Sequence, residues 1–251
     1  YKYNAGGYAV GIDYKAAQGS LIGIAAGQSF GDIKDKSNFG SDYDVDSFLA
    51  MIYGRMHPFR ESKFTLDGYG AYGRSKFKGN SYIMGSDLNG NVNSDTFSGG
   101  LYATWTERFA LGKAYVTPYT GIEFMTSELK GFSESGPYGR TFDHARAQNW
   151  TIPAGITIAR AYQTDGGTTI TPALTVAVAQ DVSRMNPKSN VTGPLGAWNV
   201  RGVNMGRTAF RLNAGIDVLF SSNWGARVCY QFETRNKLTA HGINGAISYT
   251  F

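Results

Sequence analysis

Residues 241–251 read HGINGAISYTF, and their alternation is the pattern from which the fold class follows. Counted back from the end, every second residue is apolar or glycine, while the residues between are small or polar: Phe251, Tyr249, Ile247, Gly245 and Ile243 form the apolar set. A β-strand points successive side chains to opposite faces, so the pattern predicts a strand with one apolar and one polar face. Free chain ends fray, so a strand that includes the last residue requires neighbours that hold it.

The same alternation recurs along the chain. In residues 209–220, AFRLNAGIDVLF, apolar side chains alternate with Arg211, Asn213 and Asp217. Segments of about ten to fourteen residues exceed the usual strand of about five or six and fit the roughly 9 to 11 residues that a tilted strand needs to cross a bilayer. We identify eleven segments, at 7–14, 20–30, 45–56, 63–76, 96–105, 115–124, 148–161, 168–181, 209–220, 223–233 and 241–251.

The two faces of these segments differ in a way that favours a membrane barrel. Several apolar faces begin and end with aromatic residues, such as Tyr8 and Tyr14 or Trp224 and Phe232, as expected at the two headgroup levels. The polar faces are mainly Gly, Ser, Thr and Asn, which suits an enclosed watery space better than the solvated face of a sandwich. Because an open sheet edge is too costly in hydrocarbon, we expect the last strand to pair with the first and close the barrel.

Composition excludes several other classes. The 31 Tyr and Phe residues, 33 Gly and 7 Pro are typical of strands and turns. The sequence has no apolar run of the roughly 20 residues that a membrane helix needs, and its mean hydropathy of −0.28 is too low for a bundle of such helices. The net charge of +5 comes from scattered basic residues, so we expect no nucleic-acid partner. Cys229 is the single cysteine and forms no intramolecular disulfide.

The connections alternate in length. Short ones lie at 15–19, 57–62, 110–114, 163–167 and 221–223, and long polar ones at 31–44, 78–95, 130–148 and 183–206. Outer-membrane barrels have short periplasmic turns and long outer loops, which places Phe251 on the periplasmic side and makes segment 7–14 run inward from outside. Such barrels have an even number of strands, so we expect one further strand before Tyr1 and a barrel of twelve.

The layout resembles the translocator (β) domain of autotransporters. The resemblance rests on the opening GGYAVGIDYKAAQGSLIGIAAGQSFGD at 6–32, on TPYTGIEFMTSELKGFSESG at 117–136 and on the closing aromatic. It covers all of residues 1–251, which we take as one domain. It implies an all-β, antiparallel, up-and-down transmembrane barrel in the cell outer membrane, with the first strand and a pore helix lying before Tyr1. It also implies type V secretion, in which the barrel anchors an N-terminal passenger and mediates its translocation.

The resemblance also implies partners and site residues. The partners are outer-membrane lipid and lipopolysaccharide, the outer-membrane assembly machinery and the chain's own passenger, with the barrel as a monomer. Ile247, Tyr249 and Phe251 resemble the assembly signal, because a strand with an unpaired edge is a template for strand addition. Phe132, Ser133, Glu134, Ser135 and Gly136 form a loop motif that either packs at the base of the long loop or remains a surface segment. Lumen charges would contact a helix or the passing chain, or pair with one another: Asp13, Glu123, Arg211, Asp217, Arg227 and Glu233.

Two alternatives remain open on the sequence. A small porin shares the alternating strands and differs in strand number and in a loop folded into the bore. An omptin-like surface protease requires an acidic pair and an Asp/His pair at the barrel mouth, for which Asp143 and His144 and the run Asp42, Asp44, Asp46 provide the residue types. We expect neither enzymatic activity nor a cofactor, and the Cys and His residues lack metal-ligand spacing.

Overall fold

The computed structural model describes residues 2–16, 19–34, 41–58, 63–83, 86–106, 109–220 and 223–251. Its main element is an antiparallel up-and-down sheet in which each long strand pairs with the next in the sequence, and no helix in these ranges is long and apolar enough to span a membrane. The eleven predicted segments are confirmed as strands: β1 (Lys2–Lys15), β2 (Leu21–Lys34), β3 (Asp42–Met56), β4 (Phe64–Ile83), β5 (Ser86–Trp105), β7 (Ala114–Leu129), β10 (Ala145–Ala159), β12 (Thr169–Met185), β15 (Thr208–Leu219), β16 (Trp224–Arg235) and β17 (Leu238–Tyr249).

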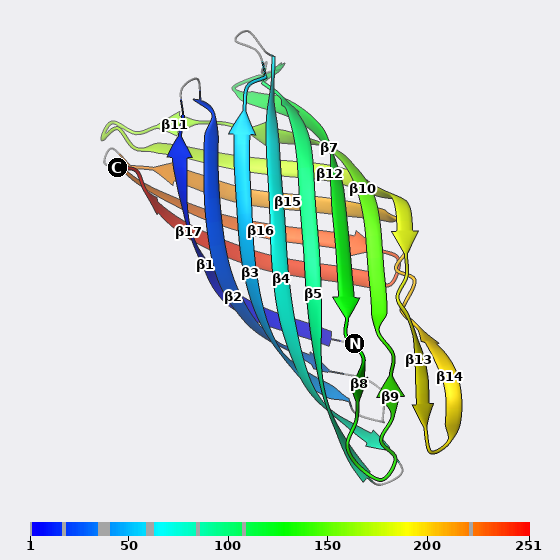
Figure 1. The fold of residues 1–251 in the computed structure, drawn as a ribbon. Coiled ribbons are helices and arrows are strands. Elements are labelled where there is room, and N and C mark those ends of the chain that lie inside the picture. The colour runs from blue at the N-terminus through cyan, green and yellow to red at the C-terminus, as the bar shows by residue number, and fades with distance from the viewer. Residues whose placement is uncertain are drawn as a thin grey trace.

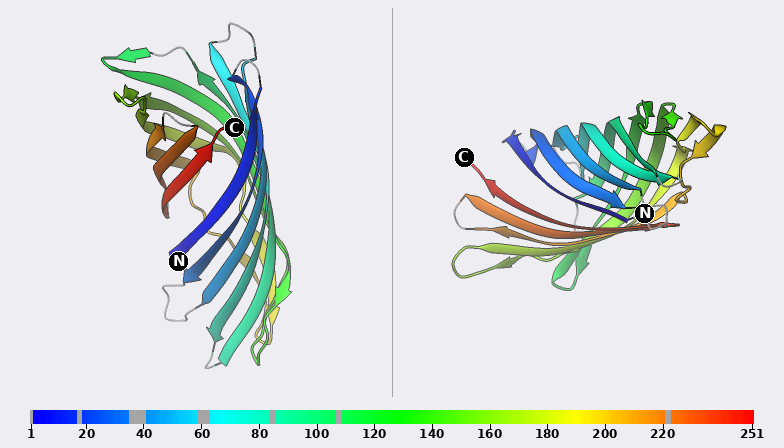
Figure 2. Two further views of the ribbon diagram at one scale, coloured as in Figure 1. Left: turned by 90° about the vertical axis from the view of Figure 1, so that its left-hand side faces the viewer. Right: turned by 90° about the horizontal axis from the view of Figure 1, so that it is seen from below.

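The sheet is strongly curled (Figures 1 and 2). Strands β1–β5 form one wall and β12, β15, β16 and β17 form the facing wall, with β7 and β10 joining them. Two short strands, β6 (Phe109–Leu111) and β11 (Tyr162–Gln163), extend the hairpins at one end, which we call the turn end. Phe251 lies at this end, and the N-terminus lies toward the other, the loop end (Figure 1).

The register places the apolar side chains on the outer face. Ile12 pairs with Ile24, and Ile24 pairs with Ile52, so one row across β1–β3 is aliphatic. The next row, Asp13, Gly23 and Tyr53, points inward. A shift of one residue would exchange the two faces, so the continuous aliphatic row fixes the register.

The outer apolar band has the span that the sequence predicts. Outward-facing Phe64 and Tyr72 lie eight residues apart on β4, and Trp224 and Phe232 lie eight apart on β16. Each stretch thus covers nine residues, which is within the roughly 9 to 11 that a tilted strand needs to cross a bilayer.

One expectation about the chain ends needs correction, and the relation of the two edge strands adds a second finding. Strand β17 ends at Tyr249 rather than Phe251; the Thr250 N–H still donates to the Asn223 carbonyl at 2.9 Å, but the Phe251 side chain is 98% exposed. In the described residues β17 pairs with β16 and β1 with β2, not with each other. The eleven long strands are joined by ten antiparallel pairings, so β1 and β17 run in the same direction. The two strands therefore cannot pair with each other in the antiparallel manner that would close the barrel directly.

The long polar connections are more ordered than the sequence indicates. Strands β4 and β5 each have 20 residues, so most of 78–95 continues their hairpin, and several strands exceed the predicted fourteen residues. Residues from two other connections form a second antiparallel sheet at the loop end (Figure 1), in the order β14 (Gly196–Arg201), β13 (Lys188–Gly193), β9 (Thr141–Phe142), β8 (Phe132–Ser133). Parts of the other expected connections, at 17–18, 35–40, 59–62 and 221–222, lie outside the described residues.

Candidate functional site in the interior of the sheet

An ion-pair network on the inner face joins three of the predicted lumen residues. Arg211 on β15 donates from Nη1 and Nη2 to Glu123 Oε1 and Oε2 on β7, at 2.8 and 3.0 Å. The Nε of Arg211 donates to Glu233 Oε2 on β16 at 2.9 Å. One guanidinium thus links three strands, with two of its bonds in the bidentate geometry that suits carboxylates.

Small residues in the wall make this reach possible. Strands β10 and β12 lie between β7 and β15, and their inward residues in the row of Arg211 are Gly155 and Ala177. A Cβ at Gly155 would lie 2.7 Å from the Ala177 Cβ and 2.8 Å from the Tyr119 ring, so the row has no room for larger side chains. The Arg211 side chain therefore crosses over this row to Glu123.

The network continues to a buried carboxylate that the sequence analysis did not single out. Arg235 Nε donates to Glu233 at 2.7 Å, and Arg235 Nη1 donates to Asp181 at 3.0 Å. Asp181 is 1% exposed and also accepts from the Thr151 hydroxyl at 2.7 Å, with Arg184 at 3.7 Å. The inward parity of Asp181 and Arg235 was readable from the alternation, but their contact depends on the registers of β12 with β15 and of β15 with β16.

Tyrosine rings cover the inward glycines of β5 and β7. A Cβ at Gly121 would lie 2.6 Å from the Tyr102 ring, and one at Gly100 would lie 2.5 Å from the Tyr69 ring. The Tyr102 hydroxyl donates to Glu123 at 2.9 Å. These two glycines therefore accommodate aromatic rings, which differs from the simple expectation that small residues keep the bore empty.

A cavity of about 610 Å³ lies beside the network, on its loop-end side. Glu123, Arg211 and Glu233 line one part of it, and the Asn186 Oδ1 on its wall is buried without a hydrogen-bond partner. The cavity therefore offers charged groups of both signs to a polar segment.

The remaining predicted lumen charges pair elsewhere on the inner face. Arg227 lies opposite Asp217 in the β15–β16 register, with Nε 3.4 Å from Oδ1, and both side chains are about half exposed. Asp13 accepts a hydrogen bond from the Tyr53 hydroxyl at 3.1 Å. None of these three residues contacts the Glu123–Arg211–Glu233 network in the described part of the chain.

The loop motif lies within the second sheet. The Phe132 ring stacks on Phe142 at 4.6 Å, and the Ser135 N–H donates to the Asn89 carbonyl on β5 at 2.9 Å. The Glu134 carboxylate is almost fully buried and accepts from Arg140 at 2.6 and 2.7 Å and from Ser81 at 2.9 Å. This hydrogen-bonded carboxylate raises the pKa of the Arg140 guanidinium.

The C-terminal residues lie on the outer face at the turn end. Ile247 is 78% exposed, and the Tyr249 ring packs against Trp224 at 5.0 Å and against Phe251 at 5.2 Å. The edge of β17 away from β16 has no partner strand among the described residues.

The residues considered for a protease are not assembled. Asp143 bonds to Asn190, whose amide donates to its carboxylate at 3.0 Å, while Asp42, Asp44 and Asp46 lie on the outer face of β3. Within the described ranges no hydrogen bond or ion pair joins the His144 side chain to these aspartates, and no group of three or more His, Cys, Asp or Glu residues is arranged to hold a metal ion.

Comparison with known proteins agrees with this geometry. Residues 1–231 match the family model described as "Autotransporter beta-domain". The fold resembles the translocator domain of the autotransporter NalP from Neisseria meningitidis, with a TM-score of 0.77 at 18% identity. The structural alignment covers 99% of this chain and 82% of that one. It also resembles the β domain of the Bordetella autotransporter BrkA, with a TM-score of 0.69 at 16% identity, covering 99% of this chain and 92% of that one.

Curated relatives are much longer than this chain. It is 26% identical over 273 residues to "Probable outer membrane protein pmp21" of Chlamydia pneumoniae, a match covering 100% of this chain and 16% of that protein. It is 27% identical over 146 residues to "Outer membrane protein B" of Rickettsia rickettsii, covering 54% of this chain and 9% of the relative. The chain therefore spans less than a fifth of the length of either relative.

Proposed function

The chain belongs to the autotransporter β-domain family, and we propose that it is the outer-membrane β-barrel that anchors an N-terminal passenger and mediates its translocation to the cell surface. The observation that carries this proposal is the contrast between the two faces of the curled sheet. The outer face presents aliphatic rows such as Ile12, Ile24 and Ile52, and the inner face holds the charged network around Arg211. Such a wall separates lipid from a polar interior.

The interior network supports a role in contact with the translocated chain. Glu123 and Glu233 share Arg211, and Arg235 is a second cation for Glu233, so each carboxylate of the network has a cationic partner in the resting wall. We infer that a polar segment entering the adjacent cavity forms hydrogen bonds with these groups, because Glu123, Arg211 and Glu233 all line it. We infer the same role, with weaker engagement, for Asp13, Asp217 and Arg227, which are more exposed.

Closure of the barrel is also part of the proposal. Strands β1 and β17 run in the same direction, and one further strand between them would be antiparallel to both. A twelve-stranded wall formed in this way agrees with the even strand number of such barrels. We infer that residues 1–251 act together as one domain and that the barrel works as a monomer.

The C-terminal residues support recognition by the outer-membrane assembly machinery. Ile247, Tyr249 and Phe251 present outward side chains on an edge strand, which suits recognition by strand addition. The outer face would meet membrane lipid and lipopolysaccharide. We infer a transport role without catalysis.

Surface display of the full-length protein tests the proposal. An epitope placed in the upstream region is expected to become accessible to protease on intact cells, and to stay inside when the segment encoding residues 1–251 is replaced by an unrelated soluble domain. The proposal fails if the barrel is folded in the outer membrane while the epitope remains protected in the periplasm.

A further inference from the structure

Residues 202–207, which join β14 to β15, form a segment that we call the strap. The strap lies at the loop end of β12 and β15. The Gly202 N–H donates to the Pro187 carbonyl at 2.9 Å. At the other end, the Asp181 N–H donates to the Arg207 carbonyl at 2.8 Å, which continues the β12–β15 ladder by one residue. Both ends of the strap are therefore fixed to the wall.

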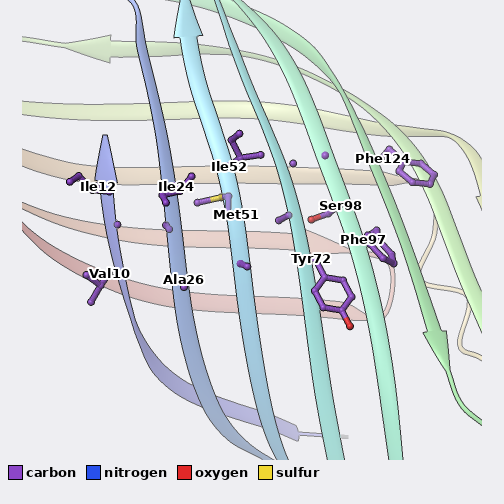
Figure 3. Close-up of a pocket in the computed structure, with 16 residues that line it drawn as sticks. Val10, Ile12, Ile24, Ala26, Met51, Ile52, Tyr72, Phe97, Ser98 and Phe124 are labelled. Atoms are coloured by element: carbon purple, nitrogen blue, oxygen red, sulfur yellow. The ribbon is translucent and has the colours of Figure 1, made fainter. Parts of the chain in front are cut away.

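The middle of the strap borders the interior cavity. Val203 and Met205 line this cavity of about 610 Å³, and so do Tyr69 and Ser98 on β4 and β5, in the wall that faces β12. The outer side of the same two strands carries side chains such as Phe97 (Figure 3). A chain that crosses the interior toward the loop end therefore passes between the strap and the inner side of this wall.

A bulge in β12 aims an arginine at the strap. Asp181 and Ser183 pair with adjacent residues of β10, so Val182 between them is an extra residue. The extra residue shifts the alternation of inward and outward side chains, and Arg184 therefore points into the cavity, on the same face as Asp181. Bulges commonly re-aim a side chain in this way. The Arg184 Nη1 donates to the Gly206 carbonyl in the strap.

The charged network of the inner face holds this arginine in place. The Arg184 side chain is 11% exposed, and its Nη1 lies 3.7 Å from the Asp181 carboxylate. Asp181 also accepts from Arg235 at 3.0 Å and from the Thr151 hydroxyl at 2.7 Å. The network that lines the cavity thus continues through Arg184 to the backbone of the strap.

The strap can leave the cavity at low cost. Gly202 and Gly206 lie near its two ends, and Gly206 has a φ of +75°. Small residues at the ends of a segment often absorb the backbone rotation of a hinge. The Val203 side chain is 56% exposed and Met205 is only partly buried, so the inward position of the strap buries little apolar surface. Segments with few buried apolar contacts open at low free energy.

We propose that the strap closes the loop-end side of the interior in the resting barrel, where Arg184 holds it, and that a passenger segment displaces it on the way to the cell surface. The inference rests on the proposed transport function and adds a conformational step to it. The strap and the passing chain compete for the same space, because Val203 and Met205 border the cavity. Return of the strap after passage restores the bond between Arg184 and Gly206 and limits leakage of solutes through the barrel.

A disulfide reports the position of the strap in the full-length protein. A Cβ at Gly206 would lie 3.0 Å from the Asn236 Cβ in the β16–β17 turn, close to the separation of about 3.5–4.5 Å in a disulfide. In a Cys229→Ser background, Gly206→Cys with Asn236→Cys is therefore expected to crosslink when the strap lies inward. The control is Gly215→Cys, which crosslinks within the wall to the native Cys229 on β16, at a Cβ separation of 3.4 Å.

Crosslinking is compared between the resting protein and a stalled intermediate. In the intermediate, a tightly folded, cysteine-free domain in the passenger holds a passenger segment inside the barrel. We expect the strap pair to crosslink several-fold less in the intermediate, because the passing chain occupies the cavity, and the control pair to crosslink equally in both states. Equal crosslinking of the strap pair in both states overturns the proposal. If no passenger segment can be photo-crosslinked inside the barrel, the transport function itself fails and this inference fails with it, so the two failures are distinguishable.

The role of Arg184 is tested in the resting protein by trypsin added to intact cells. Arg184→Gln removes the charged donor to Gly206, while Asp181 keeps its other partners. We expect cleavage after Arg207, an exposed residue of the strap, to become about tenfold faster, because cleavage follows the population of the open strap. Arg146→Gln, at the loop end of β10, is the matched control and is expected to leave this cleavage unchanged. Equal cleavage of the two variants overturns the proposal, also where the Gly206→Cys variant does not assemble.

Discussion

Arg211 on β15 forms a bidentate ion pair with Glu123 on β7, across two intervening strands. Because Arg211 also binds Glu233, its guanidinium ties three strands of the wall together on the inner face. The side chains of Arg211 and Glu123 are 24% and 17% exposed, so water screens the pair only in part.

Removal of Arg211 is expected to destabilise the barrel. Arg211→Met leaves Glu123 and Glu233 without their shared cation. We expect the free energy of unfolding to fall by about 2–3 kcal/mol, which is at the lower end of, or below, the cost of removing one partner of a fully buried pair. Urea unfolding of the refolded protein in detergent measures this change in the free energy of unfolding. The control is Arg227→Met, whose pair with Asp217 is about half exposed and is expected to contribute less than about 1 kcal/mol. Equal losses for the two variants would contradict the network.

The two faces of β1 can be distinguished at adjacent residues. In a Cys229→Ser background, Asp13→Cys is expected to react with a water-soluble maleimide in membranes, because its side chain points inward. Ile12→Cys is labelled with a fluorophore in detergent and then reconstituted into lipid. We expect quenchers attached to the lipid to reduce the fluorescence of this label, because Ile12 points outward and is 63% exposed. The reverse assignment would place the apolar face in a dry interior and remove the basis for a membrane barrel.

Gly136 is expected to be essential for the second sheet and not for the barrel. Its φ of +123° is unfavourable for other residues, and a Cβ there would lie 2.6 Å from Leu88 Cδ2. Gly136→Ala should destabilise the loop sheet by about 1–3 kcal/mol, seen as faster proteolysis within residues 130–144 at unchanged global stability. Gly166→Ala, in a turn where a Cβ would meet nothing within 4 Å, is the control. Unchanged proteolysis of Gly136→Ala would show that the motif does not order this region.

Phe251 is expected to matter for assembly and not for stability. Its side chain is almost fully exposed, and its ring contact is with Tyr249. Phe251→Ala should therefore reduce the amount of folded protein in the outer membrane several-fold, while urea unfolding of the refolded protein remains unchanged. Thr250→Ala, which keeps the backbone bond to Asn223, serves as the control. A loss of stability in vitro would assign Phe251 a structural role instead of a signal.

The site was only partly predictable from the sequence. The alternation identified Glu123, Arg211 and Glu233 as inward charges, because the side-chain direction in a strand follows parity. It did not show that the three would meet, nor that Asp181 and Arg235 would extend the network, because these contacts depend on the relative shift of strands far apart in the sequence. The loop sheet was missed for the same reason, since β9 and β13 come from different connections.

The alternation along the chain is sufficient to predict the all-β class, the eleven long strands and the lipid-facing side of each strand. These properties are local, because two-residue periodicity follows from the backbone of a single strand. The register that joins Arg211 to Glu123 and the edges left at β1 and β17 are visible only in the folded sheet. Those features arise between strands, where hydrogen-bond pairing and side-chain volume across the sheet select one alignment.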